Sequence, residues 1–238
     1  MSKETSFTIT EEQIFNAERQ RTEGRSNKAV EATQPVMEFP LDQFTNLDED
    51  GKKRVMMAAR VLTVTQESQA NHAWAAPRVA YHLARARRTI TEIYRHPDVQ
   101  NAAYQIKNDT RNNPYEFDIE MARDEVDYLL KLAALTGNVA FLNDAVLKLN
   151  YLIERSKEPT NRTLLVFNKN RLLYNAKQTE INWRVLKRSY LEAVQSSSAL
   201  GRWERAATVA APFYRQRPKK ISFTRGIRRN KGIYQGCP

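Results

Sequence analysis

The chain has 238 residues, of which 41% are hydrophobic and 27% are charged, proportions typical of a globular protein rather than of a chain disordered throughout. Its 38 basic and 27 acidic residues give a net charge of +11, which favours a polyanion or an acidic protein surface as a partner. No apolar run reaches the roughly 18 residues that a membrane-spanning helix requires.

The ends of the chain indicate a reducing compartment. The first ten residues, MSKETSFTIT, lack the basic and apolar regions of a signal peptide. The single cysteine, Cys237, has no second cysteine with which to form an internal disulfide. We therefore expect the protein to be made and kept in the cytoplasm, with no membrane span.

Charge is distributed in blocks along the chain. Residues 1–50 carry 5 basic and 11 acidic side chains, whereas residues 212–238 carry 8 basic side chains and no acidic one. Between them, residues 51–114 and 161–211 are basic and residues 115–160 are acidic. Such blocks indicate either polyanion binding or complementary contacts between chains.

Residues 1–48 are predicted to form an acidic N-terminal arm with one short helix. Thr10 and Gln13 have the spacing of a capping box, which starts a helix that Gly24 can end. Residues 25–47 are expected to be extended, because Pro35 and Pro40 restrict the backbone. The arm also has apolar side chains that can dock into pockets, namely Val36, Met37, Phe39, Leu41, Phe44 and Leu47.

Three helices are predicted in the first half of the core. Asp48 can cap a helix that runs to about Gln66. Pro77 fits the first turn of a strongly amphipathic helix that stops at His96. Pro97 can begin a third, shorter helix that ends near Asn108.

The second half of the core is predicted to be helical as well. A long helix follows Pro114 and ends at Gly137, and Asn138 can cap the next one, so that the two form a helical hairpin. Two further helices are expected after Pro159. Residues 164–167 could instead form a strand, but no second strand of similar quality is available, so we expect no sheet. Residues 203–211 can add a turn or two of helix before Pro212.

These elements predict an all-α protein. A helical bundle core, residues 49–211, is expected between two long extended arms, residues 1–48 and 212–238. The C-terminal arm has too little apolar surface to fold alone, so a binding partner must order it.

Two sets of residues are predicted to contact partners. Four arginines of the helix that begins near Pro77 fall on one face at 100° per residue and are free for a polyanion or an acidic protein; they are Arg78, Arg85, Arg88 and Arg95. The C-terminal arm contributes further basic residues to this set, which are Arg217, Lys219, Lys220, Arg225, Arg228, Arg229 and Lys231. Protein partners are expected to contact apolar residues of both arms, which are Phe39, Leu41, Phe44, Phe213, Tyr214, Phe223 and Tyr234.

No catalytic residue, cofactor site or metal site is predicted. The seven glycines form no phosphate-binding loop, and the three histidines and one cysteine do not have zinc-ligand spacing. Six acidic residues between Glu116 and Asp127 are interpreted as a solvated face near a helix N-terminus. His72 and Trp74 could line a binding pocket, but core or interface packing is the preferred interpretation.

A helical core with a basic, extended C-terminal arm resembles the head-to-tail adaptor proteins of tailed bacteriophages. In that family, helical adaptors form rings beneath the portal, and extended termini reach into neighbouring subunits. The resemblance implies a non-enzymatic structural subunit of the virion neck or tail connector, in a homo-oligomeric ring with portal or tail proteins as partners, and localisation in the virion after assembly. The alternative is a nucleic-acid-binding or ribonucleoprotein subunit, whose basic face and tail bind phosphates.

Overall fold

A computed structural model describes residues 7–110 and 113–199 of the chain. The described residues form nine α-helices, three short helical segments of other types and two strands. The α-helices are α1 (Glu11–Thr22), α2 (Ser26–Thr33), α3 (Glu49–His72), α4 (Ala76–Thr89), α5 (Pro97–Gln105), α6 (Phe117–Thr136), α7 (Val139–Arg155), α8 (Pro159–Ala176) and α9 (Glu180–Ala199). The other elements are the 3₁₀ helices η1 (Gln34–Glu38) and η2 (Leu41–Asn46), the π-helix η3 (Ile90–Tyr94), and strands β1 (Lys107–Thr110) and β2 (Asn113–Glu116).

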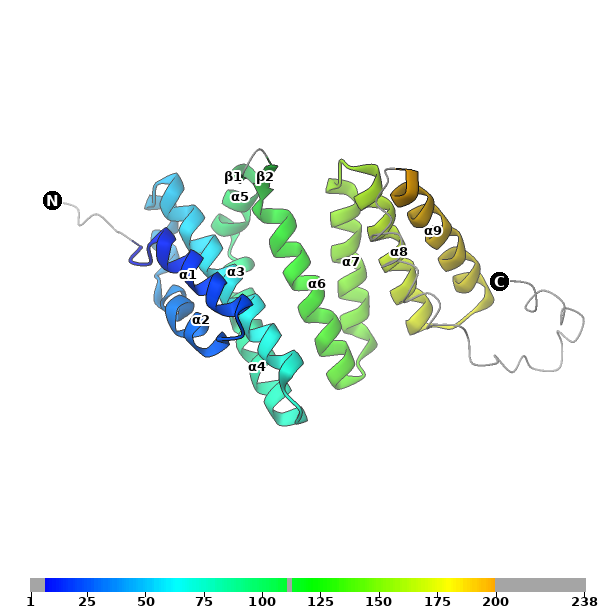
Figure 1. Cartoon of the computed structure of the whole chain (residues 1–238), viewed down its shortest axis with the longest axis horizontal. Coiled ribbons are helices and arrows are strands. Elements are labelled where there is room, and N and C mark those ends of the chain that lie inside the picture. Colours follow the sequence, from blue (N-terminus) through cyan, green and yellow to red (C-terminus); the bar gives the residue numbers. More distant parts are fainter. Residues whose placement is uncertain (1–6, 111–112, 200–238) are drawn as a thin grey trace, which may run out of the picture.

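The helices are arranged as a row (Figure 1). From α6 to α9 each helix packs against the next one in the chain. Helices α3 and α4 also pack against each other as a hairpin. At the other end of the row, α1 and α2 lie against α3. The predicted all-helical class is confirmed. None of the helices in residues 7–110 and 113–199 is both long enough and apolar enough to cross a lipid bilayer.

The N-terminal segment is helical where an extended arm was expected. Its capping box is formed as predicted, because the backbone N–H of Gln13 donates to Thr10 Oγ1 at 3.2 Å and the N–H of Thr10 donates to Gln13 Oε1 at 2.8 Å. The prediction that residues 25–47 are extended is wrong, because most of them form α2, η1 and η2. Pro35 lies in the first turn of η1 and Pro40 directly precedes η2, positions where the missing proline N–H breaks no helical hydrogen bond.

This segment shares one apolar core with α3 to α8. Val36 and Phe44 are both 1% exposed, and they belong to the same buried cluster as Leu62 of α3 and Leu129 of α6. The acidic N-terminal residues are therefore held against the core of their own chain by the apolar side chains between them.

The predicted helix ends are confirmed at three residues that cap a helix through contacts or backbone geometry within the neighbouring turn. Asp48 Oδ1 accepts the Gly51 N–H at 2.7 Å at the start of α3, which runs six residues beyond the expected end at Gln66. Gly137 ends α6 with φ of +68°, a conformation that strains other residues. Asn138 Oδ1 then accepts the Ala140 N–H at 2.9 Å, so that α6 and α7 form the predicted hairpin.

A short antiparallel pair of strands, β1 and β2, precedes α6. Lys107 and Glu116 lie opposite each other in this pair, with 3.2 Å between Lys107 Nζ and Glu116 Oε1. The sequence predicted no sheet. Four residues per strand are too few for an alternating pattern to stand out, which is why the pair was missed.

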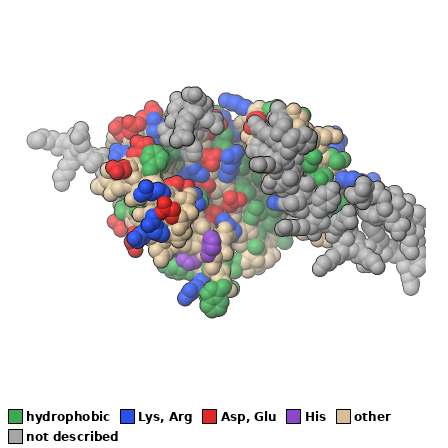
Figure 2. Space-filling view, in the orientation of Figure 1, with side chains coloured by type: hydrophobic (Ala, Val, Ile, Leu, Met, Phe, Trp, Pro, Cys, Tyr) green, Lys and Arg blue, Asp and Glu red, His purple; other side chains and the backbone are tan. Residues whose placement is uncertain are grey.

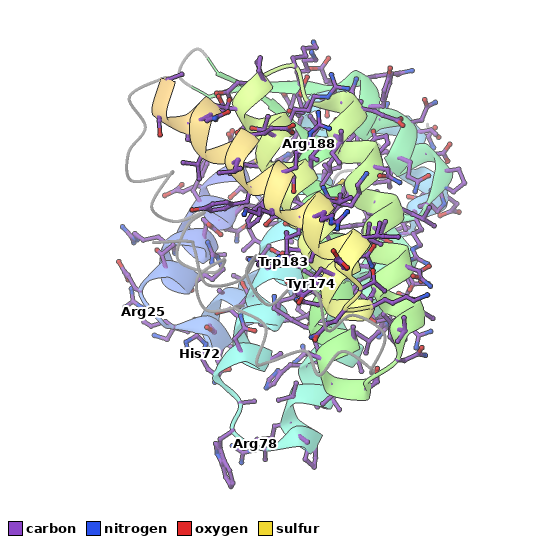
Figure 3. The ribbon with its side chains drawn as sticks, turned by 90° about the vertical axis from the view of Figure 1, so that its right-hand side faces the viewer. Arg25, His72, Arg78, Tyr174, Trp183 and Arg188 are labelled. Carbon is purple, nitrogen blue, oxygen red and sulfur yellow. The ribbon has the colours of Figure 1, made fainter. Side chains whose placement is uncertain are left out.

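The last hairpin has an apolar cluster of its own. Phe167 and Tyr174 of α8 pack against Leu186 and Ala193 of α9, apart from the main core. The rings of Tyr174 and Trp183 lie 5.5 Å apart between the two helices (Figure 3). Residues 164–167, the alternative strand, lie inside α8.

Candidate functional site

Helix α6 is joined to its neighbours by ion pairs that we call the α6 ion-pair network. At its centre, Arg60 of α3 donates to both carboxylate oxygens of Asp124, with Nε 2.8 Å from Oδ2 and Nη2 3.1 Å from Oδ1. The Tyr94 hydroxyl donates to the same Oδ2 at 2.9 Å. Burial, and then the neighbouring Asp124, raise the pKa of Tyr94, so that the phenol stays protonated at neutral pH.

Glu125, the next residue of α6, has two cationic partners from different elements. Its Oε1 lies 2.6 Å from Arg95 Nη2 after η3, and its Oε2 lies 2.7 Å from Lys148 Nζ on α7. Since each carboxylate oxygen meets a cation, the buried charge is neutralised on both sides.

Glu67 and Lys131 form a separate ion pair between α3 and α6. Lys131 Nζ lies 2.5 Å from Glu67 Oε2, whereas the buried Glu67 Oε1 accepts no hydrogen bond within the described parts of the chain. Burial raises the pKa of Glu67 to about 7, although Lys131 acts in the opposite direction. This carboxyl group therefore changes its charge near neutral pH.

The predicted solvated face of α6 is wrong at three of its acidic residues. Asp124 and Glu125 are buried, and the Asp118 side chain is only 8% exposed in its ion pair with Arg155. A sequence signal for this burial exists, since Asp124 and Glu125 follow Met121 at helical spacing on the apolar stripe. Their cationic partners come from other helices, so the spacing along α6 gives no sign of them.

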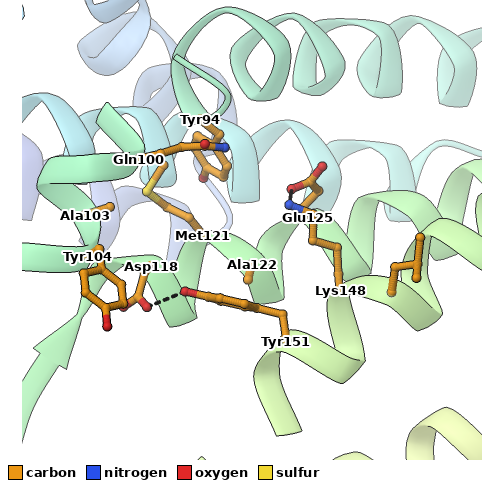
Figure 4. A pocket seen from close by; sticks show the side chains of 11 residues that line it. Tyr94, Gln100, Ala103, Tyr104, Asp118, Met121, Ala122, Glu125, Lys148 and Tyr151 are labelled. Atoms are coloured by element: carbon orange, nitrogen blue, oxygen red, sulfur yellow. Dashed lines mark hydrogen bonds and ion pairs between the residues drawn. The ribbon is translucent and has the colours of Figure 1, made fainter. Parts of the chain in front are cut away.

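A pocket of about 430 Å³ lies between α5, α6 and α7 (Figure 4). Its polar walls come from Asp118, Glu125 and Lys148, and Tyr104 and Tyr151 add aromatic surface. The Tyr151 hydroxyl donates to Asp118 Oδ2 at 2.7 Å, and Arg155 Nε donates to the same oxygen at 2.9 Å.

The chemistry of this pocket suits binding more than proton transfer. Burial, and then the hydrogen bond to Asp118, raise the pKa of Tyr151 to about 12. The two carboxylates are already paired with Arg155 and with Lys148 and Arg95. An incoming polar group would therefore have to compete with existing ion pairs, whereas an aromatic or aliphatic group can contact the exposed rings.

The four predicted arginines do not form a free cationic face. Arg85 Nη2 donates to Gln34 Oε1 of η1 at 2.7 Å, Arg88 pairs with Glu92 at 2.8 Å, and Arg95 belongs to the α6 ion-pair network. Arg78 is exposed at the lower end of the molecule in Figure 3 and has no such partner among the described residues. Figure 2 shows basic and acidic side chains interspersed over the α1–α4 part of the visible face.

The predicted partner contacts of the N-terminal arm lie against their own chain. Phe44 is buried in the main core, Leu41 is half-buried against it, and Phe39 packs edge-to-face on Phe7 with ring centres 5.5 Å apart. The predicted contacts of the C-terminal arm lie outside the described residues; they are Phe213, Tyr214, Phe223 and Tyr234, with the basic residues Arg217, Lys219, Lys220, Arg225, Arg228, Arg229 and Lys231.

The most exposed aromatic side chain of the described residues is Trp74, for which the sequence predicted core or interface packing. It is 88% exposed in the connection between α3 and α4, so packing in the core is wrong and an interface contact stays a prediction. The neutral residues on both sides of it, Ala73, Ala75 and Ala76, were the available signal, because they offer no bulky neighbour to cover an indole ring. Tyr81, in the second turn of α4, is also more than half exposed.

Histidine, cysteine and carboxylate side chains do not gather into a potential metal site anywhere in residues 7–110 and 113–199. Comparisons with protein families, with curated proteins and with solved structures found no match to this chain. The proposals that follow therefore rest on the residues and contacts of this molecule.

Proposed function

We propose that this protein is a non-enzymatic structural subunit of a large assembly, which docks to neighbouring subunits through exposed apolar side chains and its basic C-terminal arm. The proposal rests on a contrast between the charged side chains of the protein, which are paired when buried, and its large apolar side chains, several of which are exposed. The buried carboxylates of α6 are neutralised within the chain, whereas large apolar side chains are exposed on several helices.

Exposed large apolar side chains occur on helices along most of the row. Trp74 and Tyr81 lie at the α3–α4 hairpin, and Ile181, Val185 and Leu191 are exposed on α9. Single exposed apolar residues are ordinary on protein surfaces, but a nearly fully exposed tryptophan is unusual, and tryptophan is enriched at interface hot spots.

The virion neck or tail connector is the assembly that the resemblance to phage head-to-tail adaptors suggests. Two features support it. The described core is a row of helices, and eight basic residues without an acidic one follow it in residues 212–238. In a ring of identical subunits, such an arm can pair with the acidic surface of residues 1–50 on a neighbour.

Nucleic-acid binding is the second candidate, and the charge of the C-terminal arm favours it. The folded part adds less to this function than its arginine count suggests, because Arg85, Arg88 and Arg95 already have partners. Phosphate contacts would then depend mainly on the arm.

Removal of residues 212–238 tests both candidates. For the connector, we expect the full chain to form a larger particle of fixed mass and the truncated chain to form a smaller or less stable one, as measured by sedimentation velocity. For the alternative, binding of a random-sequence oligonucleotide should weaken steeply with salt, and the salt dependence should become shallower when the arm's basic residues are replaced by glutamine. A full chain that is monomeric at every concentration and binds no oligonucleotide contradicts both.

A further inference from the structure

The pocket between α5, α6 and α7 is bordered by large apolar and aromatic side chains that reach solvent (Figure 4). Tyr104 of α5 is 56% exposed, Leu147 of α7 is 66% exposed, and Tyr151 of α7 is half-buried beside them. We call it the α5–α7 pocket. Its volume of about 430 Å³ lies within the range of pockets that bind ligands. The rim therefore suits an incoming aromatic or aliphatic side chain.

The cations around the α5–α7 pocket are already paired. Lys148 and Arg95 both contact Glu125, and Arg155 contacts Asp118. An acidic partner would have to break these ion pairs and leave a buried carboxylate without its cation, which disfavours such a partner.

Two carboxylates on the outer face of α7 are available to a basic partner instead. Asp144 and Glu154 are both exposed, and neither has a cation within ion-pair distance among residues 7–110 and 113–199. At 100° per residue they share a sector of about 80° with Leu147 and Tyr151, and they lie one turn to either side of that pair. With a rise of 1.5 Å per residue, the two carboxylates are about 15 Å apart along the helix. The matching partner is an aromatic residue with a cation on each side.

The C-terminal arm of this chain contains one such sequence. Of the aromatic residues in 212–238, Phe223 is the one with a basic residue within three positions on both sides, namely Lys220 and Arg225. An extended peptide advances about 3.3 Å per residue, so residues five positions apart are about 16–17 Å apart. This spacing matches the spacing of the two carboxylates on α7.

The arm leaves the described fold within reach of the pocket. Figure 1 shows that the end of α9 lies on the same side of the row as the end of α7, with α8 between the two helices. Packed helices lie about 8–10 Å apart, whereas the 20 residues between Ala199 and Lys220 can span up to about 65 Å. A tethered segment has an effective concentration of about millimolar, so it occupies a site on its own chain ahead of the same segment from another copy.

We propose that residues 220–225 bind the α5–α7 pocket of their own chain, with Phe223 in the pocket and with Lys220 and Arg225 beside Asp144 and Glu154. The contact lies within one chain, so it does not depend on the proposed assembly role. A neighbouring subunit or a nucleic acid that takes up the arm must first displace Phe223.

The first test places a spin label at Ser222→Cys in the full-length chain, with Cys237→Ser so that the label has a single site. Nuclear magnetic resonance signals of the backbone amides of residues 144–154 should be broadened, and those of α1, at the other end of the row, should not. Isotope-labelled chains without the spin label, mixed with spin-labelled chains without the isotope, should show no broadening, because the contact lies within one chain.

The second test removes the anchor or the rim of the pocket. Phe223→Ala should abolish the broadening, and Tyr234→Ala, the matched change at another aromatic of the arm, should leave it unchanged. Leu147→Gln should abolish it as well. Val139→Gln, at a residue of α7 that is 51% exposed and does not line the pocket, is the matched control. Circular dichroism verifies that each variant retains its helix content.

The third test exchanges the charges. Lys220→Glu with Arg225→Glu should lower the ratio of docked to free arm about tenfold, because two exposed ion pairs become two repulsive contacts. Addition of Asp144→Lys and Glu154→Lys to that variant should restore the broadening. Failure of the combined variant to recover it would show that these charges do not meet.

Each contrary outcome identifies the part that is wrong. Equal broadening over all helices of the wild-type chain overturns the inference. Broadening that occurs in the mixed sample places the arm on a neighbouring copy and overturns docking within one chain. Broadening that survives Phe223→Ala excludes Phe223 as the anchor. The assembly role is judged separately, from the mass of the wild-type particle.

Discussion

At the scale of single residues, Glu67 links the stability of the fold to pH. It is 3% exposed, and burial raises its pKa from 4.5 to about 7 in spite of Lys131. Between these two values the folded chain binds a proton that the unfolded chain has lost. The folded state is therefore stabilised by this proton fully below about pH 4.5, and this stabilisation is lost as the pH rises through about 7.

Glu67→Gln should remove this dependence. We expect the free energy of unfolding of the variant, relative to wild type, to rise by about 2–3 kcal/mol between about pH 5 and pH 8, since one pKa unit corresponds to about 1.4 kcal/mol. Urea unfolding at both pH values measures the difference. An equal effect of the substitution at the two pH values would show that Glu67 does not titrate in this range.

Arg60 shows what the burial of an ion pair means for stability. Arg60→Met leaves Asp124 buried without its guanidinium partner and should cost about 3–5 kcal/mol of unfolding free energy. Arg188→Met, which breaks an exposed pair with Glu192 on α9, is the control and should cost less than about 1 kcal/mol. Similar losses in the two variants, measured by denaturant unfolding, would mean that the Asp124 carboxylate is effectively solvated.

These buried charges also mark the limit of what could be predicted from the sequence at this scale. The helix caps at Thr10, Asp48 and Asn138 are local, and they were predicted correctly. The Arg60–Asp124 pair joins residues 64 positions apart, so that neither residue alone predicts it. The exposure of Trp74 depends in the same way on the absence of neighbours from elsewhere in the chain.

At the scale of elements, helical periodicity predicted α3, α4, α6, α7 and α9, because each has an apolar stripe of its own. The start of α5 was predicted from Pro97, and α8 from its content of apolar residues. Periodicity failed for residues 25–47, where α2, η1 and η2 are too short for a repeating pattern. Helices α2 and η1 are stabilised by packing on α3, and η2 contacts α5. Pro35 and Pro40 restrict the backbone in a way that fits an extended segment, but the same restriction fits the start of a helix, where both lie in the structure.

The α8–α9 hairpin should open more readily than the rest of the molecule. Its cluster of Phe167, Tyr174, Leu186 and Ala193 is separate from the main core, and α9 packs mainly on α8. Amides of α9 should therefore exchange hydrogen faster than amides of α3, as measured by mass spectrometry of the full chain.

Leu186→Ala should accelerate exchange further in α9 and leave α3 protected. Leu62→Ala, a buried leucine of the main core, is the matched substitution and should lower protection in α3, at a cost of about 2–5 kcal/mol in global stability. If Leu186→Ala lowers protection equally in both helices, α9 unfolds only together with the whole chain.

At the scale of the whole molecule, the basic blocks of the sequence differ in how much charge they can offer to a partner. The basic block of residues 51–114 is largely tied to neighbours, as Arg60, Arg88 and Arg95 show. The C-terminal block of eight basic residues remains the main charge for a partner in the proposed function. Trp74, in the connection between α3 and α4, is a large exposed apolar side chain at a different place, so the proposed subunit has two kinds of docking element.

The mass of the full-length wild-type particle tests this account most directly. Native mass spectrometry of the purified chain should show one dominant species at a fixed integer multiple of the 27.6 kDa subunit, as a closed ring requires. A single species of 27.6 kDa at every protein concentration and ionic strength would contradict it.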